Sequence, residues 1–246
     1  MNQELDATAE DRLAKLSTAK KLNIALSGLA IAASIAFMLG NVPLRLPAAV
    51  VLALLPGLLI YLLHRDPSLY AMFKPRRDQR TNLGIAFLIC GLGLILGSSH
   101  LHFVDAPILG VYVVLVALLC CVGVFSSGSQ NSEFLSAVFG MLILGVLYSW
   151  GLAMTADALL DKSPPATYIA AVQDKHESHG RSTSYYLDLT PWGPFDRPNS
   201  VSVSHTTYDD AFIGERICLE LRPGVLHVRW YQVVPCAEQT GSRQME

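Results

Sequence analysis

Five apolar segments of about bilayer length occupy the first two thirds of this chain. They cover 22–40, 46–63, 83–104, 107–126 and 134–155. Each is close to the roughly 20 residues that a helix needs to cross the hydrocarbon core. None of the five contains Asp, Glu, Lys or Arg, and the whole chain is only 15% charged, against about 25% in soluble domains. The sequence therefore predicts a membrane α-helical bundle of about five transmembrane helices.

A short basic segment separates the second apolar segment from the third. Residues 64–80 contain five cations, namely Arg65, Lys74, Arg76, Arg77 and Arg80. Carrying each of them to the bilayer centre costs about 2.5–3.5 kcal/mol or more, so loops rich in Lys and Arg stay in the cytoplasm. The turn at 41–47 has one cation and the turn at 97–106 has none. We therefore expect the 64–80 loop to determine the topology and to face the cytoplasm.

The amino-terminal residues 1–21 agree with this orientation. They carry four basic residues and are expected to form a polar cytoplasmic helix. A cleaved signal peptide is the alternative, but its apolar region should be about 7–15 residues long and its start should be basic, without acids. The segment 22–40 is longer, and Glu4, Asp6, Glu10 and Asp11 precede it. We interpret 22–40 as an uncleaved first span.

The side of the carboxy-terminal part depends on the number of crossings. Five crossings from a cytoplasmic amino terminus place it outside, in the periplasm or the extracellular space. The 126–133 loop should then be cytoplasmic, although it has no Lys or Arg. If one segment is re-entrant and only four cross, the tail is cytoplasmic instead. We favour the outside placement, in a cell (inner) membrane.

Residues 161–246 differ in pattern from the apolar region and are expected to form a small C-terminal all-β domain. Strands are predicted at 168–172, 184–189, 201–204, 213–221 and 225–234, with a helical turn at 206–212. Arg222-Pro223-Gly224 is a turn signal, so the last two strands are expected to form a hairpin. Five short strands in this length indicate a twisted sheet or a partly open barrel. The region 22–160 is the transmembrane domain.

Two glycines in the third segment are candidates for helix packing. Gly93 and Gly97 are four residues apart, and such a pair lets two helix backbones approach closely. We expect this contact within one bundle rather than in a homodimer.

The carboxy-terminal domain contains two cysteines, Cys218 and Cys236. An isolated pair in a small extracytoplasmic domain is a candidate disulfide. In a simple hairpin that turns at Pro223-Gly224, however, Cys218 faces about residue 228. Reaching Cys236 then requires the sheet to curl.

One polar cluster near the membrane is a candidate metal site. His100, His102 and Asp105 follow the third apolar segment, and imidazole and carboxylate groups bind zinc. The two histidines are two apart and diverge on a helix, so the segment would have to be extended. We favour the interpretation that these side chains contact water and lipid headgroups, and we expect no metal and no cofactor.

The tail also carries a resemblance. Tyr185-Tyr186-Leu187, Gly214-Glu215-Arg216-Ile217-Cys218, Gly224-Val225-Leu226 and Trp230-Tyr231 lie in an order that resembles small β-domains appended to membrane anchors in uncharacterised bacterial multi-pass membrane proteins. The resemblance covers about 167–236 and includes no catalytic motif. It implies location and architecture, and no activity.

The functional prediction is an interaction or structural protein rather than an enzyme. The formal net charge of -2 indicates no nucleic-acid partner. The expected partners are the lipid bilayer and another envelope protein or a second copy of this chain. Two alternatives stay open: a metal-dependent membrane enzyme that uses His100, His102 and Asp105, and a channel or permease. The lack of ionisable groups in the spans counts against transport, because transport sites usually contain them.

Overall fold

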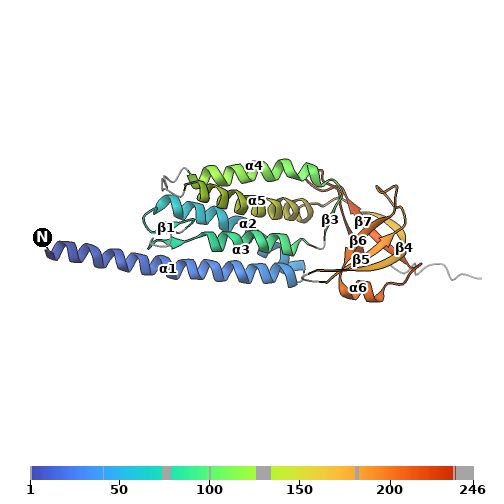
Figure 1. The fold of residues 1–246 in the computed structure, drawn as a ribbon, viewed down its shortest axis with the longest axis horizontal. Helices are drawn as coiled ribbons and strands as arrows, with labels where there is room; N and C mark the ends of the chain where they lie inside the picture. The colour runs from blue at the N-terminus through green and yellow to red at the C-terminus, as the bar shows by residue number, and fades with distance from the viewer. Residues whose placement is uncertain are drawn as a thin grey trace, which may run out of the picture. The chain divides into compact units, whose positions relative to one another are not determined.

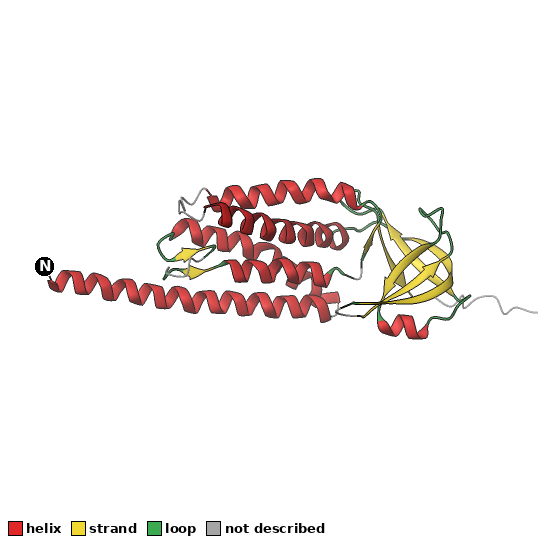
Figure 2. Ribbon diagram, viewed as in Figure 1, coloured by secondary structure: helices red, strands yellow, loops and turns green. Residues whose placement is uncertain are grey.

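The computed structural model describes residues 2–40, 42–73, 79–99, 101–125, 134–180, 183–234 and 236. The chain forms two compact units, shown as ribbons in Figures 1 and 2. The helical unit comprises Met1–Ser99 and Ala106–Leu160, and the β unit comprises His100–Asp105 and Asp161–Glu246. The short segment between the third and fourth helices thus belongs to the β unit.

The helical unit contains five helices that lie side by side (Figure 1). They are α1 (Asn2–Leu39), α2 (Val42–Arg65), α3 (Gly84–Gly97), α4 (Ala106–Phe125) and α5 (Phe134–Leu159). Three of them contain stretches long and apolar enough to cross a membrane, at Asp11–Leu39, Pro43–Arg65 and Val138–Leu159. The helix α3 is short, with 14 residues, and packs against α1, α2 and α5.

Small residues allow these helices to approach one another. A Cβ on Gly91 would press on the Tyr148 backbone of α5, and one on Gly151 would press on Leu94 of α3. Tyr148 also donates a hydrogen bond of 2.6 Å from its hydroxyl to the Ala53 carbonyl of α2. The core around these contacts includes Phe87, Leu52 and Leu59, which are fully buried.

The helix boundaries differ from the sequence predictions in three places. The predicted third span, 83–104, is helical only to Gly97, because residues 102–103 form a strand. The polar helix at 1–21 and the first span are one continuous helix, α1. The predicted turn at 41–47 is shorter, since α2 begins at Val42 and contains Pro47. Proline at 43 is tolerated there because the first helical turn has no intrahelical N–H bond to lose.

The β unit is a six-stranded antiparallel sheet that curls into a half-barrel. Its strands are β3 (His102–Phe103), β4 (Ala166–His179), β5 (Thr183–Leu189), β6 (Asn199–Val203), β7 (Arg216–Arg222) and β8 (Trp230–Val234). Their order across the sheet is β3-β8-β7-β4-β5-β6. The short helix α6 (His205–Asp210) follows β6, capped by the Ser204 hydroxyl, which accepts a hydrogen bond from the Thr207 N–H. Inside the curl lies a core of Leu187, Leu189, Leu219, Trp192 and Tyr231.

The tail strands lie near their predicted positions, with two differences. The strand β4 extends to His179, seven residues beyond the predicted strand 168–172, and residues 176–179 pair with β5. The connection from β7 to β8 spans residues 223–229 and is not a tight hairpin turn. Five of the six strands come from the predicted domain, and the sixth, β3, comes from residues assigned to the third span.

Candidate functional site in the β unit

The strand β3 joins the sheet along β8. His102 lies opposite Tyr231 and Phe103 lies opposite Trp230. The rings of His102 and Tyr231 stack with centroids 5.0 Å apart. Burial raises the pKa of Tyr231 to about 12, so its phenol stays protonated at neutral pH. The strand β3 is therefore part of the sheet, through its backbone pairing with β8 and the stacking of His102 on Tyr231.

An ion pair closes the end of this strand. Arg229 donates from Nε to Asp105 Oδ2 at 2.7 Å and from Nη2 to Asp105 Oδ1 at 3.0 Å. The Val104 N–H donates to the Arg229 carbonyl at 2.8 Å. The hydrogen bonds from Arg229 hold the pKa of Asp105 below its ordinary value. We call β3 together with the Asp105–Arg229 pair the clasp.

The clasp changes the interpretation of the candidate zinc ligands. Both carboxylate oxygens of Asp105 already accept hydrogen bonds from a cation, and His102 stacks on Tyr231. His100 lies outside the described residues. Within the described part of the chain, no group of three His, Cys, Asp or Glu side chains is arranged to hold a metal ion. Asp105 is thus paired with Arg229 as part of the fold.

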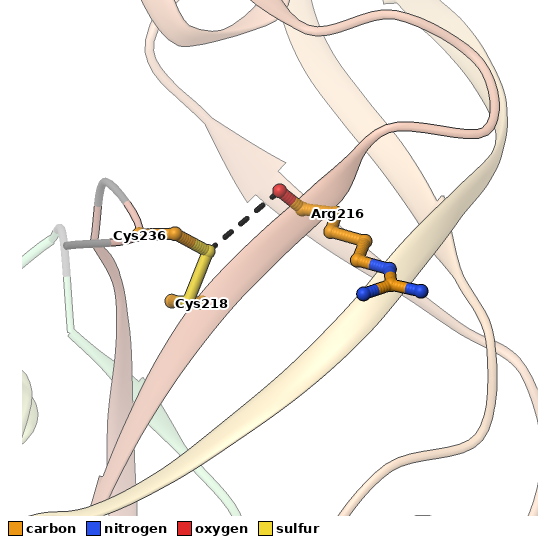
Figure 3. The surroundings of a disulfide bond; sticks show 3 residues. All are labelled: Arg216, Cys218 and Cys236. Carbon is orange, nitrogen blue, oxygen red and sulfur yellow. Dashed lines mark hydrogen bonds between the residues drawn. A yellow bond between two sulfur atoms is a disulfide. The ribbon is translucent and has the colours of Figure 1, made fainter. Parts of the chain in front are cut away.

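Cys218 and Cys236 lie at disulfide distance, with their Cα atoms 5.0 Å apart (Figure 3). In the β7–β8 ladder the residue opposite Cys218 is Val234. Cys236 lies two residues beyond Val234 in the sequence. The expectation that Cys218 faces about residue 228 was wrong, because it assumed a two-residue turn where the connection has seven residues. The Cys236 sulfur also lies 3.7 Å from the Arg216 carbonyl.

A cavity of about 400 Å³ lies beside this disulfide. Its lining includes Asp210 of α6, Arg216 and Ile217 of β7, Val233 and Val234 of β8, and Cys236. It mixes one cation, carboxylates and apolar side chains. None of its lining residues is a histidine, and its one sulfur is in the disulfide, so the lining offers no activated nucleophile.

A second polar cluster occupies the outer face of β4, β5 and β6. Asp188 pairs with His176 Nδ1 at 3.3 Å and accepts a hydrogen bond from the Ser200 hydroxyl. In a nucleophilic triad the histidine stands between the acid and the serine. Here the acid stands between them, so Ser200 has no base. The arrangement of these three side chains is therefore not that of a nucleophilic triad.

The candidate packing glycines face α1. A Cβ on Gly93 would collide with the Ser34 side chain, and one on Gly97 would collide with the Phe37 ring. Both contacts lie inside the helical unit, as expected of a pair used within one bundle.

Of the five cations expected to determine the topology, Arg65 and Arg80 are described, whereas Lys74, Arg76 and Arg77 lie outside the described residues. The loop is closed at its base by the parallel strands β1 (Tyr70–Ala71) and β2 (Thr81–Asn82). The side chains of Tyr70 and Met72 are buried in the helical core. This loop is therefore anchored at both of its ends.

One ionisable side chain escaped the sequence analysis. The helix α5 continues to Leu159, four residues beyond the predicted span, and its last turn includes the fully buried Asp157. Arg229 was also missed as the partner of Asp105. A signal for β3 was present in the extended, aromatic pattern His102-Phe103-Val104, but its partner strand lies more than 120 residues further along the chain.

Comparison of the chain with protein-family models, with curated proteins and with solved structures finds no match. The resemblance to small β-domains of bacterial membrane proteins therefore has no support from a relative. The function must be inferred from the geometry.

Proposed function

We propose that this chain is a five-span membrane protein that presents the β unit outside the cytoplasm as an interaction domain. The single observation that carries this proposal is the clasp. It places residues between α3 and α4 in the same sheet as residues that follow α5.

The clasp restricts the number of crossings. The α3–α4 connection and the tail share one sheet, so they must lie on the same side of a membrane. The helices α4 and α5 must then either both cross or both fail to cross. A single re-entrant segment at α4 or α5 is inconsistent with this pairing, whereas a re-entrant α3 is compatible with it and would bring the tail into the cytoplasm.

The distribution of charge supports the orientation. The basic segment 64–80 and the four basic residues of 1–21 lie at one end of α1, α2 and α3 in any alternating arrangement. The opposite end then carries the 97–106 turn, which has no Lys or Arg. Because cationic loops stay in the cytoplasm, this favours an outward β unit.

The short helix α3 is compatible with a crossing. Its 14 residues rise about 21 Å, less than the roughly 30 Å of a bilayer core. However, it is surrounded by α1, α2 and α5, and non-helical backbone at membrane depth is tolerated where protein covers it. The flanking residues Leu83 and Ser98 are buried. The helix α4, with 20 residues, has the length of an ordinary span.

The side chains of the β unit favour a role in binding another molecule over a role in catalysis. Its polar clusters consist of paired side chains, and its cavity presents no activated nucleophile. Asp105, which the alternative zinc enzyme requires, is engaged by Arg229. One observation bears on the channel or permease alternative: α5 buries the ionisable side chain of Asp157 in its last turn, whereas the sequence prediction has spans without charged residues.

The test is a topology measurement with paired reporters. Alkaline phosphatase or green fluorescent protein is fused after Glu246 and, in a second series, within the 126–133 loop of the full chain. We expect phosphatase activity and no fluorescence at the carboxy terminus, and the reverse in the loop. A fluorescent carboxy-terminal fusion would overturn the proposal.

A further inference from the structure

The sheet of the β unit ends in three kinds of edge, and they differ in how they are protected. The edge strand β3 has only two residues. Beyond Val172, β4 pairs only with β5, and its free edge carries Asp174, Lys175 and Glu177. Short length and charged side chains are the devices by which proteins block edge-to-edge pairing. The third edge is formed by β6, which is longer than β3 and carries no charged side chain.

The edge of β6 is uncharged and regular. Asn199-Ser200-Val201-Ser202-Val203 pairs with β5 without a bulge over all five residues. Its outward backbone groups make no backbone hydrogen bond to any part of the chain that the structure describes. Ser200 and Ser202 are exposed on the outer face, while Val201 is buried on the inner face.

The chain that follows β6 leaves this edge open. The helix α6 turns back over the sheet, where Tyr208 contacts the Tyr185 ring of β5 at 5.1 Å and lies 4.3 Å from Lys175 Nζ of β4. Its packing partners are therefore the strands further inside the sheet. A row of free donors and acceptors remains along β6.

We propose that the β6 edge pairs with the β6 edge of a second copy of this chain, in an antiparallel ladder centred on Val201. This inference deepens the proposed function and rests on it, since it names the partner of the interaction domain. In that register all five residues pair, with Val201 opposite Val201 and Ser200 opposite Ser202 of the partner. Facing β-branched residues favour strand pairing.

Electrostatics permit this pairing. No residue of β6 is charged. The nearest carboxylate on the outer face, Asp188, is opposite Ser200 on β5. With strands about 4.8 Å apart and about 3.4 Å per residue, the two Asp188 positions would be about 16 Å apart. That exceeds the Debye length of about 8 Å at physiological salt, so their repulsion is screened.

The first test counts subunits of the full-length protein in lipid vesicles, by photobleaching of a carboxy-terminal label over a series of protein-to-lipid ratios. We expect dimers in the native chain and at least tenfold weaker dimerisation in S200K/S202K. The matched control is H176K/S178K, which places two lysines in the same i, i+2 spacing on the outer face of β4, two strands from the β6 edge. We expect its dimerisation to match that of the native chain.

The second test does not depend on the folding of a lysine variant. Two differently tagged copies, one Ser200→Cys and one Ser202→Cys, are coexpressed and treated in membranes with a short thiol cross-linker. We expect a cross-linked heterodimer from this pair and none from Ser178→Cys with Ser202→Cys. A monomeric native chain at every ratio would overturn the second copy as partner, and equal dimerisation of S200K/S202K and the control would overturn the β6 ladder.

The outcomes separate this inference from the function on which it rests. If the carboxy terminus reports an outside location and S200K/S202K still forms a complex through its β unit, the proposed function stands and the β6 ladder is wrong. A cytoplasmic carboxy terminus overturns the proposed function whether or not the chain dimerises.

Discussion

The helical unit leaves many more large apolar side chains exposed than the β unit does. In α1 the buried side chains include Ala19, Ala30 and Ala33, whereas Ile24 and Leu39 are 71% and 80% exposed. In the β unit the largest side chains, Trp192 and Tyr231, are inside. A large exposed apolar surface around a packed core is an arrangement that lipid permits, because lipid gives large apolar groups no reason to leave the surface.

The comparison teaches that the two units draw stability from different sources. The helical unit combines a core of large apolar side chains such as Phe87 and Leu52 with close backbone approach at its glycines. The β unit depends on an aromatic core, a ladder of strand pairs, a disulfide and the clasp. We therefore expect different kinds of substitution to lower the unfolding free energy most in the two units.

The largest effect is expected in the aromatic core of the β unit. Trp192 packs against Tyr231, Phe195 and Tyr168, with ring centroids 4.9, 5.1 and 5.9 Å away, and its Nε1 donates to Asn199. We expect Trp192→Ala to destabilise this unit by about 3–5 kcal/mol, measured by hydrogen exchange of its strands. Phe212→Ala, at a side chain that is 71% exposed, should change it by about 0.5 kcal/mol or less. Similar losses in both variants would contradict the assigned core.

Removal of the disulfide should come next. Cys218 and Cys236 are 18 residues apart, a closure that contributes about 3 kcal/mol in the chain-entropy model. We expect Cys218→Ser with Cys236→Ser to lower the unfolding free energy of the β unit by that amount and to leave the helical unit unchanged. A reductant should lower the unfolding free energy of the native β unit by the same amount and leave that of the double variant unchanged. Thiol labelling of Cys218 in the native, unreduced protein would show that the bond is absent.

A smaller effect is expected in the helical unit. Gly97→Ala pushes a methyl group into the Phe37 ring, and overpacking of this kind costs about 1–3 kcal/mol. Gly28→Ala in α1, where a Cβ meets nothing within 4 Å, should be neutral or stabilising, since alanine favours helix over glycine. Thermal unfolding in detergent compares the two variants. Equal midpoints would mean that α3 does not approach α1 at Gly97.

The smallest effect concerns the clasp and depends on pH. The ion pair is partly exposed, and pairs of this kind contribute about 1 kcal/mol or less. The pKa of Asp105 is lowered by folding, so its contribution is present above the unfolded value of about 3.9 and is lost as pH falls through the folded value. We therefore expect Asp105→Asn to be destabilising at pH 7 and to match the native chain at the lowest pH, in urea unfolding curves. A difference that grows as pH falls would contradict this sign.

Local patterns predicted most of the elements. Continuous apolar composition located the helices within a few residues, and alternation located five strands, because both signals depend on near neighbours in the chain. The errors fall where the outcome depended on a distant residue. The third span ended early because His102 and Phe103 pair with Tyr231 and Trp230. The facing residue of Cys218 was misassigned because the length of the β7–β8 connection was not evident from the turn signal.

By itself, the sequence determined that this chain has an apolar helical part and a polar β part, since composition and charge set the transfer free energy of each segment. Only the tertiary structure decided that residues 102–105 belong to the β unit, that Arg229 is the partner of Asp105, and that β6 is an open edge. Those features depend on which strands meet, and strand pairing is decided by the summed packing of the whole sheet rather than by any one of its segments.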